Sequence, residues 1–170
     1  MLTLSTEHIR MRQQAANKEE ALQLLADILA ADGLTLPEYL NGLKAREAQT
    51  STYLGQGIAI PHGTPESRSS ILNTGVRLVH FPDGVLWDGE NKAYLAVVIA
   101  AKSDEHLQIL QLLKRVLIRT EGLHMDKEPF SFIKAKTGKG MPLPFGQRMD
   151  YLISMLRNQL DLDRNRVFNP

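Results

Sequence analysis

Tyr94–Ala101 read YLAVVIAA, which is a run of eight consecutive apolar residues. Side chains alternate between the two faces of a β-sheet, so a strand that is apolar at every position is covered on both faces. A helix that spans a membrane needs about 20 apolar residues, and this run of eight is too short for one. The run therefore predicts a buried strand of an α/β protein, with helices on each side of its sheet.

Helices are expected on both sides of this strand in the sequence. An Asn-x-x-Glu pattern that begins at Asn17 matches a capping box, and apolar residues then recur at helical spacing, which predicts a helix over about 18–32. A Thr-x-x-Glu pattern that begins at Thr35 predicts the start of a second helix, which is expected to end just beyond Arg46. Leucines at intervals of three and four residues predict a third helix after Lys102.

Shorter strands are predicted between the second and third helices. Strand-forming residues occupy Thr50–Leu54, a short apolar segment at Ile58–Pro61 ends in proline, and Gly75–Phe81 is rich in β-branched and aromatic residues. The stretch from Pro82 to Asn91 is rich in turn-forming residues and is expected to separate the last two strands. Strands and helices in this arrangement indicate the α/β class.

The composition is that of one ordinary folded domain. The chain has 170 residues, of which 43% are hydrophobic and 23% are charged, so a disordered, collagen-like or coiled-coil chain is excluded. The formal net charge of +1 gives no support to binding of nucleic acid or of an anionic membrane. The chain has no cysteine, which excludes disulfides and thiolate chemistry and fits a reducing compartment. We therefore expect a cytoplasmic protein.

The C-terminal part of the sequence has a different character. Glycine and proline interrupt any periodic pattern from residue 119 to residue 147, and only residues 148–160 have the apolar spacing of an amphipathic helix. We expect a single domain over residues 1–170, with an atypical tail over 119–170.

Two histidines and one arginine are candidates for chemistry. His62 follows a short predicted strand and a proline, and the carboxyl ends of strands are where open α/β sheets place their ligands. His106 falls in the first turn of the third predicted helix, where unpaired backbone N–H groups suit an anion. Arg46 can bind phosphate oxygens through two parallel hydrogen bonds. The alternatives are a structural histidine at 62, a helix-capping histidine at 106 and a surface arginine at 46.

The other histidines and the common enzyme motifs give no further candidate for a site. His8, His80 and His124 are expected to be exposed or to have structural roles. The sequence contains no GxxxxGK[ST], GxGxxG, HExxH or GxSxG motif. A histidine and arginine set of this kind favours the handling of an anion over hydrolysis by a metal.

Three segments of the sequence are recognisable together. They are REAQTSTYLGQGIAIPHGTPESR at 46–68, ILNTGVRLVHFPDGV at 71–85 and IAAKSDEHLQIL at 99–110. In order and spacing they closely resemble the EIIA domain of the bacterial phosphoenolpyruvate-dependent sugar phosphotransferase system, mannitol/fructose type, over roughly residues 1–118. The resemblance is greatest to the fructose-specific members. It implies a mixed sheet of about five strands, covered by helices on both faces.

The resemblance also implies a function and a site. The chain would accept a phosphoryl group from phospho-HPr on His62 and pass it to a cysteine of the EIIB component of a fructose/mannitol-type permease. His106 would be the second active-site histidine, and Arg46 would stabilise the phosphate. Phosphorylation is expected at Nε2 of His62, with the other ring nitrogen held by a hydrogen bond. This scheme needs no metal, organic cofactor or nucleic acid, and it involves the membrane only through the permease.

Two alternatives to sugar transport stay open at this point. The first is a regulatory module of the same fold, similar to the nitrogen-related EIIA proteins, in which phosphorylation controls the binding of a partner. The second is a scaffold that has kept the fold and lost transfer because of its unusual tail. The choice of fructose over mannitol depends on the resemblance alone.

Overall fold

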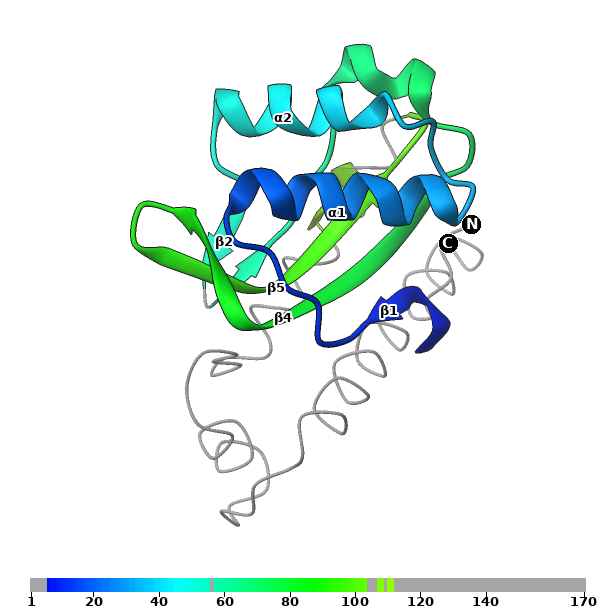
Figure 1. Cartoon of the computed structure of the whole chain (residues 1–170). Helices are drawn as coiled ribbons and strands as arrows, with labels where there is room; N and C mark the ends of the chain where they lie inside the picture. Colours follow the sequence, from blue (N-terminus) through cyan, green and yellow to red (C-terminus); the bar gives the residue numbers. More distant parts are fainter. Residues whose placement is uncertain (1–5, 56, 104–106, 109, 112–170) are drawn as a thin grey trace, which may run out of the picture.

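The computed structural model describes residues 6–55, 57–103, 107, 108, 110 and 111 (Figure 1). In this part of the chain five strands form one mixed sheet in the order β1-β4-β5-β3-β2. The strands are β1 (Ile9–Arg10), β2 (Tyr53–Gly55), β3 (Ile58–Ala59), β4 (Gly75–Asp88) and β5 (Asn91–Ala100). β1 is parallel to β4 and β3 is parallel to β5, whereas β4 pairs with β5, and β2 with β3, in antiparallel fashion.

The long hairpin of β4 and β5 departs from the sequence-based prediction. Pro82–Asn91 was expected to be a turn region, but β4 continues through Pro82 as far as Asp88, so this prediction is wrong. The pairing shifts register between His80 and Val85, which accommodates Pro82 and the positive φ of Gly84 (71°) within the strand. Proline and glycine within a strand often mark a bulge of this kind. The turn itself is confined to residues 89 and 90.

The first helix forms where the sequence predicts it. α1 spans Lys18–Ala31, and the Asn17 side chain accepts a hydrogen bond of 2.9 Å from the backbone N–H of Glu20. The Glu20 carboxylate in turn accepts one of 2.9 Å from the backbone N–H of Ala16. These reciprocal bonds satisfy N–H groups that have no partner within the helix.

The second helix begins later than predicted. α2 spans Tyr39–Gln49, and Thr35 does not cap it, so the predicted start is wrong. Thr35 instead pairs with Ile71 as an isolated antiparallel bridge. Pro37 explains the difference, because the residue that precedes a proline is disfavoured in the helical region. A 3-10 helix, η2 (Pro65–Ser70), packs beside α2, and a shorter one, η1 (Thr6–His8), precedes β1.

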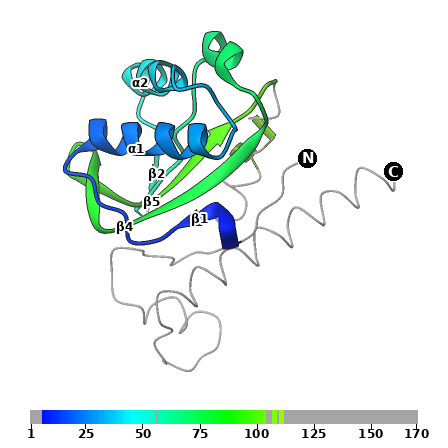
Figure 2. The ribbon, with the colours of Figure 1, turned by 45° about the vertical axis from the view of Figure 1, so that its right-hand side comes forward.

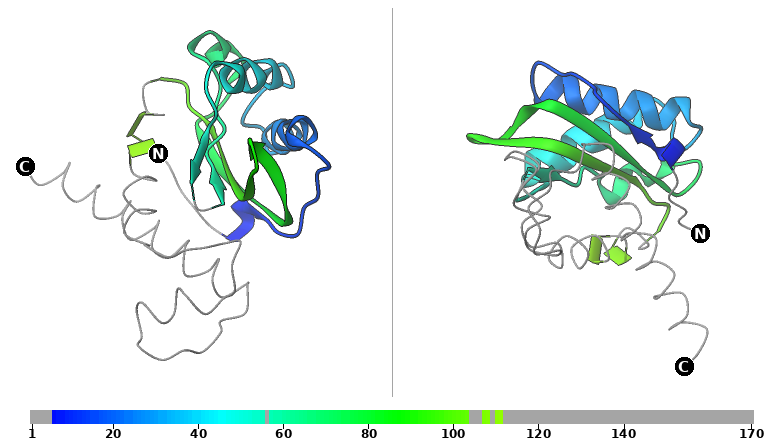
Figure 3. Two further views of the ribbon diagram at one scale, coloured as in Figure 1. Left: turned by 90° about the vertical axis from the view of Figure 1, so that its left-hand side faces the viewer. Right: turned by 90° about the horizontal axis from the view of Figure 1, so that it is seen from below.

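Both described α-helices lie on one face of the sheet (Figures 1–3). α1 packs on α2 and on β4, and their apolar side chains form a core with alternate residues of β5, namely Ala96, Val98 and Ala100. The intervening residues of β5, Leu95, Val97 and Ile99, are buried as well. The prediction that this strand is buried on both of its faces is therefore confirmed, whereas helices over the second face stay a prediction.

The mixed five-stranded α/β sheet with helices is confirmed. Of the helix that was predicted after Lys102, the four described residues (107, 108, 110 and 111) are helical. The rest of that helix and the one expected over 148–160 lie outside the described residues, and the single domain over 1–170 stays a prediction. No helix in the described part of the chain is long and apolar enough to span a membrane.

Candidate active site

His62 lies at the edge of the sheet where two parallel strands end. It follows β3 and forms an isolated parallel bridge with Ile99, near the end of β5. The backbone N–H of Ile99 donates a hydrogen bond of 2.9 Å to the carbonyl of Pro61. The sequence-based placement of this histidine at the carboxyl end of a strand is correct. The residue is only 8% exposed, so its ring is largely held by the protein.

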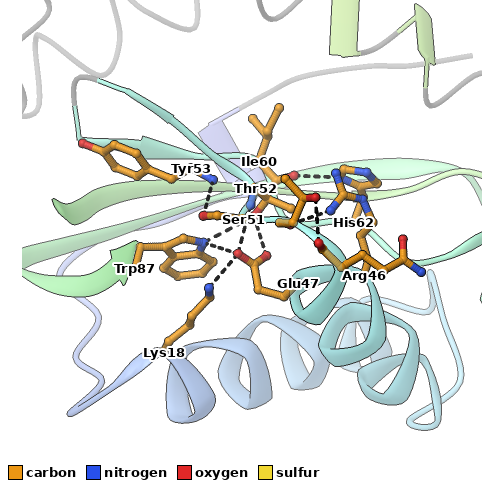
Figure 4. A network of polar contacts seen from close by, with 11 residues as sticks. Lys18, Arg46, Glu47, Ser51, Thr52, Tyr53, Ile60, His62 and Trp87 are labelled. Carbon is orange, nitrogen blue, oxygen red and sulfur yellow. Dashed lines mark hydrogen bonds and ion pairs between the residues drawn. The ribbon is translucent and has the colours of Figure 1, made fainter. Parts of the chain in front are cut away.

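The hydrogen bond of the His62 ring defines its tautomer. Nδ1 lies 2.8 Å from the carbonyl oxygen of Ile60 (Figure 4). A carbonyl oxygen can only accept a hydrogen bond, so Nδ1 must carry the proton. In the neutral ring the lone pair is then on Nε2. This nitrogen is the nucleophilic atom of the ring.

Tyr39, the first residue of α2, fixes the peptide that follows His62. Its hydroxyl accepts a hydrogen bond of 2.8 Å from the N–H of Gly63 and donates one of 2.9 Å to the carbonyl of Ile99. The side chain is almost fully buried, and this burial raises the pKa of Tyr39 to about 12, despite an opposing effect of the hydrogen bond from Gly63. The hydroxyl therefore stays protonated at neutral pH and joins the His62 segment to β5.

A shallow hollow lies beside His62. It is lined by Tyr39, His62, Gly63, Thr64, Pro65, Arg68, Ile71, Ile99 and Ala101. Arg68 comes from η2 and is one of the residues that line the hollow. Guanidinium groups bind phosphate oxygens well, which makes Arg68 a candidate for binding an anion here. Within the described residues, no group of three potential metal ligands comes together.

Arg46 lies in the last turn of α2, and its Nη1 donates a hydrogen bond of 2.6 Å to the carbonyl of Thr50. Figure 4 draws Arg46, which belongs to α2, together with His62, which belongs to the segment after β3. The described contacts of Arg46 thus secure the end of the helix. His106, the other residue predicted for the site, lies outside the described residues, as does His124.

Glu47, next to Arg46, is a buried carboxylate at the centre of a polar network (Figure 4). Its Oε1 accepts hydrogen bonds from the N–H of Thr52 (2.9 Å) and from Nε1 of Trp87 (2.9 Å), and it lies 2.8 Å from Nζ of Lys18. Its Oε2 accepts one from the hydroxyl of Thr52 (2.6 Å). Burial alone would raise the pKa of Glu47, but the bonds from Lys18 and Thr52 outweigh it and lower the pKa.

The sequence analysis missed Tyr39, Glu47 and Arg68. Tyr39 and Glu47 stand four residues before and after Leu43, so all three share one face of a helix. Tyr39, Leu43 and Glu47 are all buried. A polar residue that continues an apolar stripe at this spacing is a signal that could have identified Glu47. Arg68 gives no such signal, because η2 brings it to the hollow through tertiary structure.

The Tyr39→Phe variant is expected to lower the free energy of unfolding by about 1–2 kcal/mol, because it leaves the Gly63 N–H and the Ile99 carbonyl without their partner. The pKa of Tyr39 is higher in the folded chain (about 12) than its ordinary value of 10.0. Its contribution is therefore complete below pH 10 and is lost as the pH rises toward 12. In urea unfolding, the difference between wild type and variant should shrink over this range; a constant difference would contradict the assignment.

Comparison with known proteins gives one consistent family. The model of the family "Phosphoenolpyruvate-dependent sugar phosphotransferase system, EIIA 2" matches residues 3–125. The multiphosphoryl transfer protein of Vibrio cholerae is 54% identical over 117 residues, which are 69% of this chain and 29% of that protein. The mannitol-specific EIICBA component of Pasteurella multocida is 37% identical over 128 residues, which are 74% of this chain and 20% of that protein. The chain thus spans less than a third of the length of these relatives.

Solved structures agree with this. The crystal structure of IIA mannitol from Escherichia coli is 33% identical, has a TM-score of 0.68 and is matched over 88% of this chain and 99% of its own. The complex of enzyme IIAMTL with phosphorylated enzyme IIBMTL, also from Escherichia coli, is 33% identical, with a TM-score of 0.66 over 82% of this chain and 100% of that chain. The likeness extends to both sequence and fold.

Proposed function

Since the chain belongs to the EIIA 2 family of the phosphoenolpyruvate-dependent sugar phosphotransferase system, we propose that it is a phosphocarrier with His62 as its phosphorylated residue. The donor is phospho-HPr, and the acceptor is the EIIB component of a fructose/mannitol-type permease. The observation that carries this proposal is the hydrogen bond from Nδ1 of His62 to the Ile60 carbonyl, which leaves the lone pair of the neutral ring on Nε2.

The chemistry follows from this tautomer. Nε2 of His62 attacks the phosphorus of phospho-HPr; the new P–N bond forms as the P–N bond of the donor breaks, and the donor histidine leaves with its electron pair. The proton on Nδ1 stays in its hydrogen bond to the carbonyl oxygen of Ile60, and this oxygen stabilises the positive charge that the ring acquires. A thiolate of EIIB then attacks the same phosphorus, and Nε2 leaves as a neutral nitrogen. The covalent intermediate divides one transfer into two.

Positive charge near the transferred group would stabilise this reaction, because phosphoryl transfer depends chiefly on positioning and electrostatics. We assign this task to Arg46, and Arg68 of the hollow is a further candidate. His106 as second active-site histidine stays a prediction. The cytoplasmic location and the preference for fructose also stay predictions. The complex of IIAMTL with phosphorylated IIBMTL supports EIIB as the partner.

The test is phosphorylation with phosphoenolpyruvate, enzyme I and HPr, followed by mapping of the phosphate by mass spectrometry under alkaline conditions. Label on His62 that a fructose-type EIIB then removes is the expected result. Label on His62 that is not removed by fructose- or mannitol-type EIIB would favour the regulatory module. A folded protein that takes up no label would favour the scaffold that has lost transfer.

Arg46→Ala is expected to slow phosphoryl transfer by about 100- to 1,000-fold, as loss of one donor that stabilises developing charge does at other sites. Stability should fall by less than about 1 kcal/mol, because the side chain makes an exposed hydrogen bond with Thr50. Quenched time courses of labelling measure the rate of transfer, and thermal unfolding measures the stability separately. Arg46→Lys keeps the positive charge but cannot bind a phosphate group in a bidentate manner, so it should recover part of the rate. A large loss of stability with an unchanged rate would remove Arg46 from the site.

A further inference from the structure

Glu47 makes no described contact with His62, and the transfer chemistry does not use it. Its side chain is 5% exposed, yet it holds a carboxylate with four donors around it. These donors come from three parts of the chain: Lys18 at the start of α1, Thr52 before β2, and Trp87 in β4. A buried carboxylate with this many partners holds its surroundings in one arrangement.

We propose that Glu47 is a positioning residue for His62, acting through the main chain of Thr52 and Ile60. The consequence for transfer rests on the proposed function of His62, whereas the consequence for the ring tautomer does not.

The first step from Glu47 toward His62 is the pair of hydrogen bonds between Glu47 and Thr52. The two carboxylate oxygens accept bonds from the backbone N–H and from the hydroxyl of Thr52, so both the main chain and the side chain of this residue are fixed. Trp87 and Lys18 hold the carboxylate from the other sides, and the Lys18 ammonium also lies 5.7 Å from the centre of the Trp87 ring. Thr52 therefore has little freedom to shift while Glu47 keeps its charge and place.

The second step runs from Thr52 to the imidazole. The carbonyl of Thr52 accepts a hydrogen bond of 3.0 Å from the N–H of Ile60, and the carbonyl of Ile60 accepts the bond of 2.8 Å from Nδ1 of His62. Figure 4 shows the two ends of this connection, the contacts of Glu47 with Thr52 and the contact of Ile60 with His62. A displaced Thr52 would shift Ile60, and the carbonyl that selects the His62 tautomer would lose its alignment.

The chain offers a matched control for a test. Glu19 also forms an ion pair with a lysine, Lys44 (3.1 Å), but its side chain is 78% exposed and the pair lies on the surface. Glu47→Gln and Glu19→Gln therefore make the same chemical change in a connected and in an unconnected carboxylate. Trp87 is the only tryptophan, so its fluorescence reports whether the network around residue 47 is still packed.

The experiment is ¹⁵N NMR of the histidine rings in the full chain, at a pH where they are neutral, with the His62 signals assigned from their loss in His62→Gln. In the wild type and in Glu19→Gln, Nδ1 should have the shift of a protonated nitrogen and Nε2 that of an unprotonated one. In Glu47→Gln the two shifts should move toward each other, and transfer from phospho-HPr should slow by up to about 100-fold, which is the cost of misplacing a reacting group by about 1 Å. If Glu47→Gln does not fold, Thr52→Val is the second variant: it removes the hydroxyl that donates to Glu47 (2.6 Å) and accepts from Trp87 (3.3 Å), and it keeps the backbone bond from Thr52 to Glu47. It should move the shifts in the same direction.

The outcomes separate this inference from the proposed function. A folded Glu47→Gln protein whose His62 shifts equal those of the wild type would overturn the positioning role, and so would a Glu19→Gln protein with the same change as Glu47→Gln. If wild-type His62 takes up no phosphate, the proposed function fails, but the ring shifts still decide whether Glu47 sets the tautomer.

Discussion

Phosphoryl uptake should disappear altogether when His62 is replaced by glutamine. Glutamine has a similar reach and can still donate a hydrogen bond to the Ile60 carbonyl, but its amide nitrogen has no basic lone pair to attack phosphorus. The side chain sits at the end of a strand and outside the apolar core, so the fold should be kept. The variant should unfold at a temperature close to that of the wild type while it takes up no label from phospho-HPr.

The matched control for this prediction is His8→Gln. His8 lies in η1 and precedes β1, and the proposed chemistry does not involve it. This variant should be labelled at the wild-type rate and on the same peptide. Persistent label in His62→Gln, mapped to the peptide that contains His106, would contradict the assignment of the nucleophile and would exchange the roles of the two histidines.

Some elements could be predicted from the sequence because their causes are local. α1 has its capping residues and its apolar stripe within one short segment, and both form as predicted. β5 is apolar at every position over its second half, as expected for a strand that is buried on both faces, and its β-branched residues favour a strand. In these cases the residues that determine the element all lie within one short stretch of sequence.

Other elements depend on partners that are distant in the sequence. β4 runs through Pro82 because β5 supplies hydrogen bonds on either side of the register shift, which no local pattern indicates. β1 has two residues, and it is a strand only because β4 pairs with it. Thr35 has the local pattern of a helix cap, but its pairing with Ile71 and the effect of Pro37 decide its conformation.

The candidate site divides in the same way. The position of His62 follows from a strand, a proline and a glycine that are neighbours in the sequence. Its tautomer depends on the Ile60 carbonyl, whose alignment involves Thr52, and its following peptide depends on Tyr39, which is 24 residues away from Gly63. The sequence can thus indicate which residue reacts, but the groups that orient it are assembled only by the fold.

Gly63→Ala is expected to have the second-largest effect on the site, because the peptide that follows His62 has no space for a side chain. A Cβ atom at residue 63 would lie 2.6 Å from Cε2 of Tyr39 and closer still to Oγ of Ser67. Contacts this short force neighbouring groups to move, and such overpacking destabilises proteins by about 1–3 kcal/mol. Urea unfolding should show a loss in this range.

Gly42 provides a comparison that separates packing from site geometry. A Cβ there also meets Ser67, but its next neighbour, Cα of Gly63, is 3.7 Å away, which is ordinary contact. Ser67→Gly should therefore restore most of the stability that Gly42→Ala loses and only part of the loss in Gly63→Ala, where Tyr39 still clashes. Equal rescue of both variants would show that Tyr39 yields without strain.

Gly63→Ala should slow phosphoryl transfer by more than its loss of stability can explain. To admit the methyl group the Tyr39 ring must move, and its hydroxyl then loses the bonds to the Gly63 N–H and the Ile99 carbonyl. These bonds join the His62 segment to β5, so their loss displaces Nε2 from the line of attack. Labelling from phospho-HPr should therefore be slow even at a temperature where the variant is fully folded, whereas Gly42→Ala with Ser67→Gly should be labelled nearly as fast as the wild type. A folded Gly63→Ala protein with the wild-type rate would mean that Tyr39 supports the fold but does not orient His62.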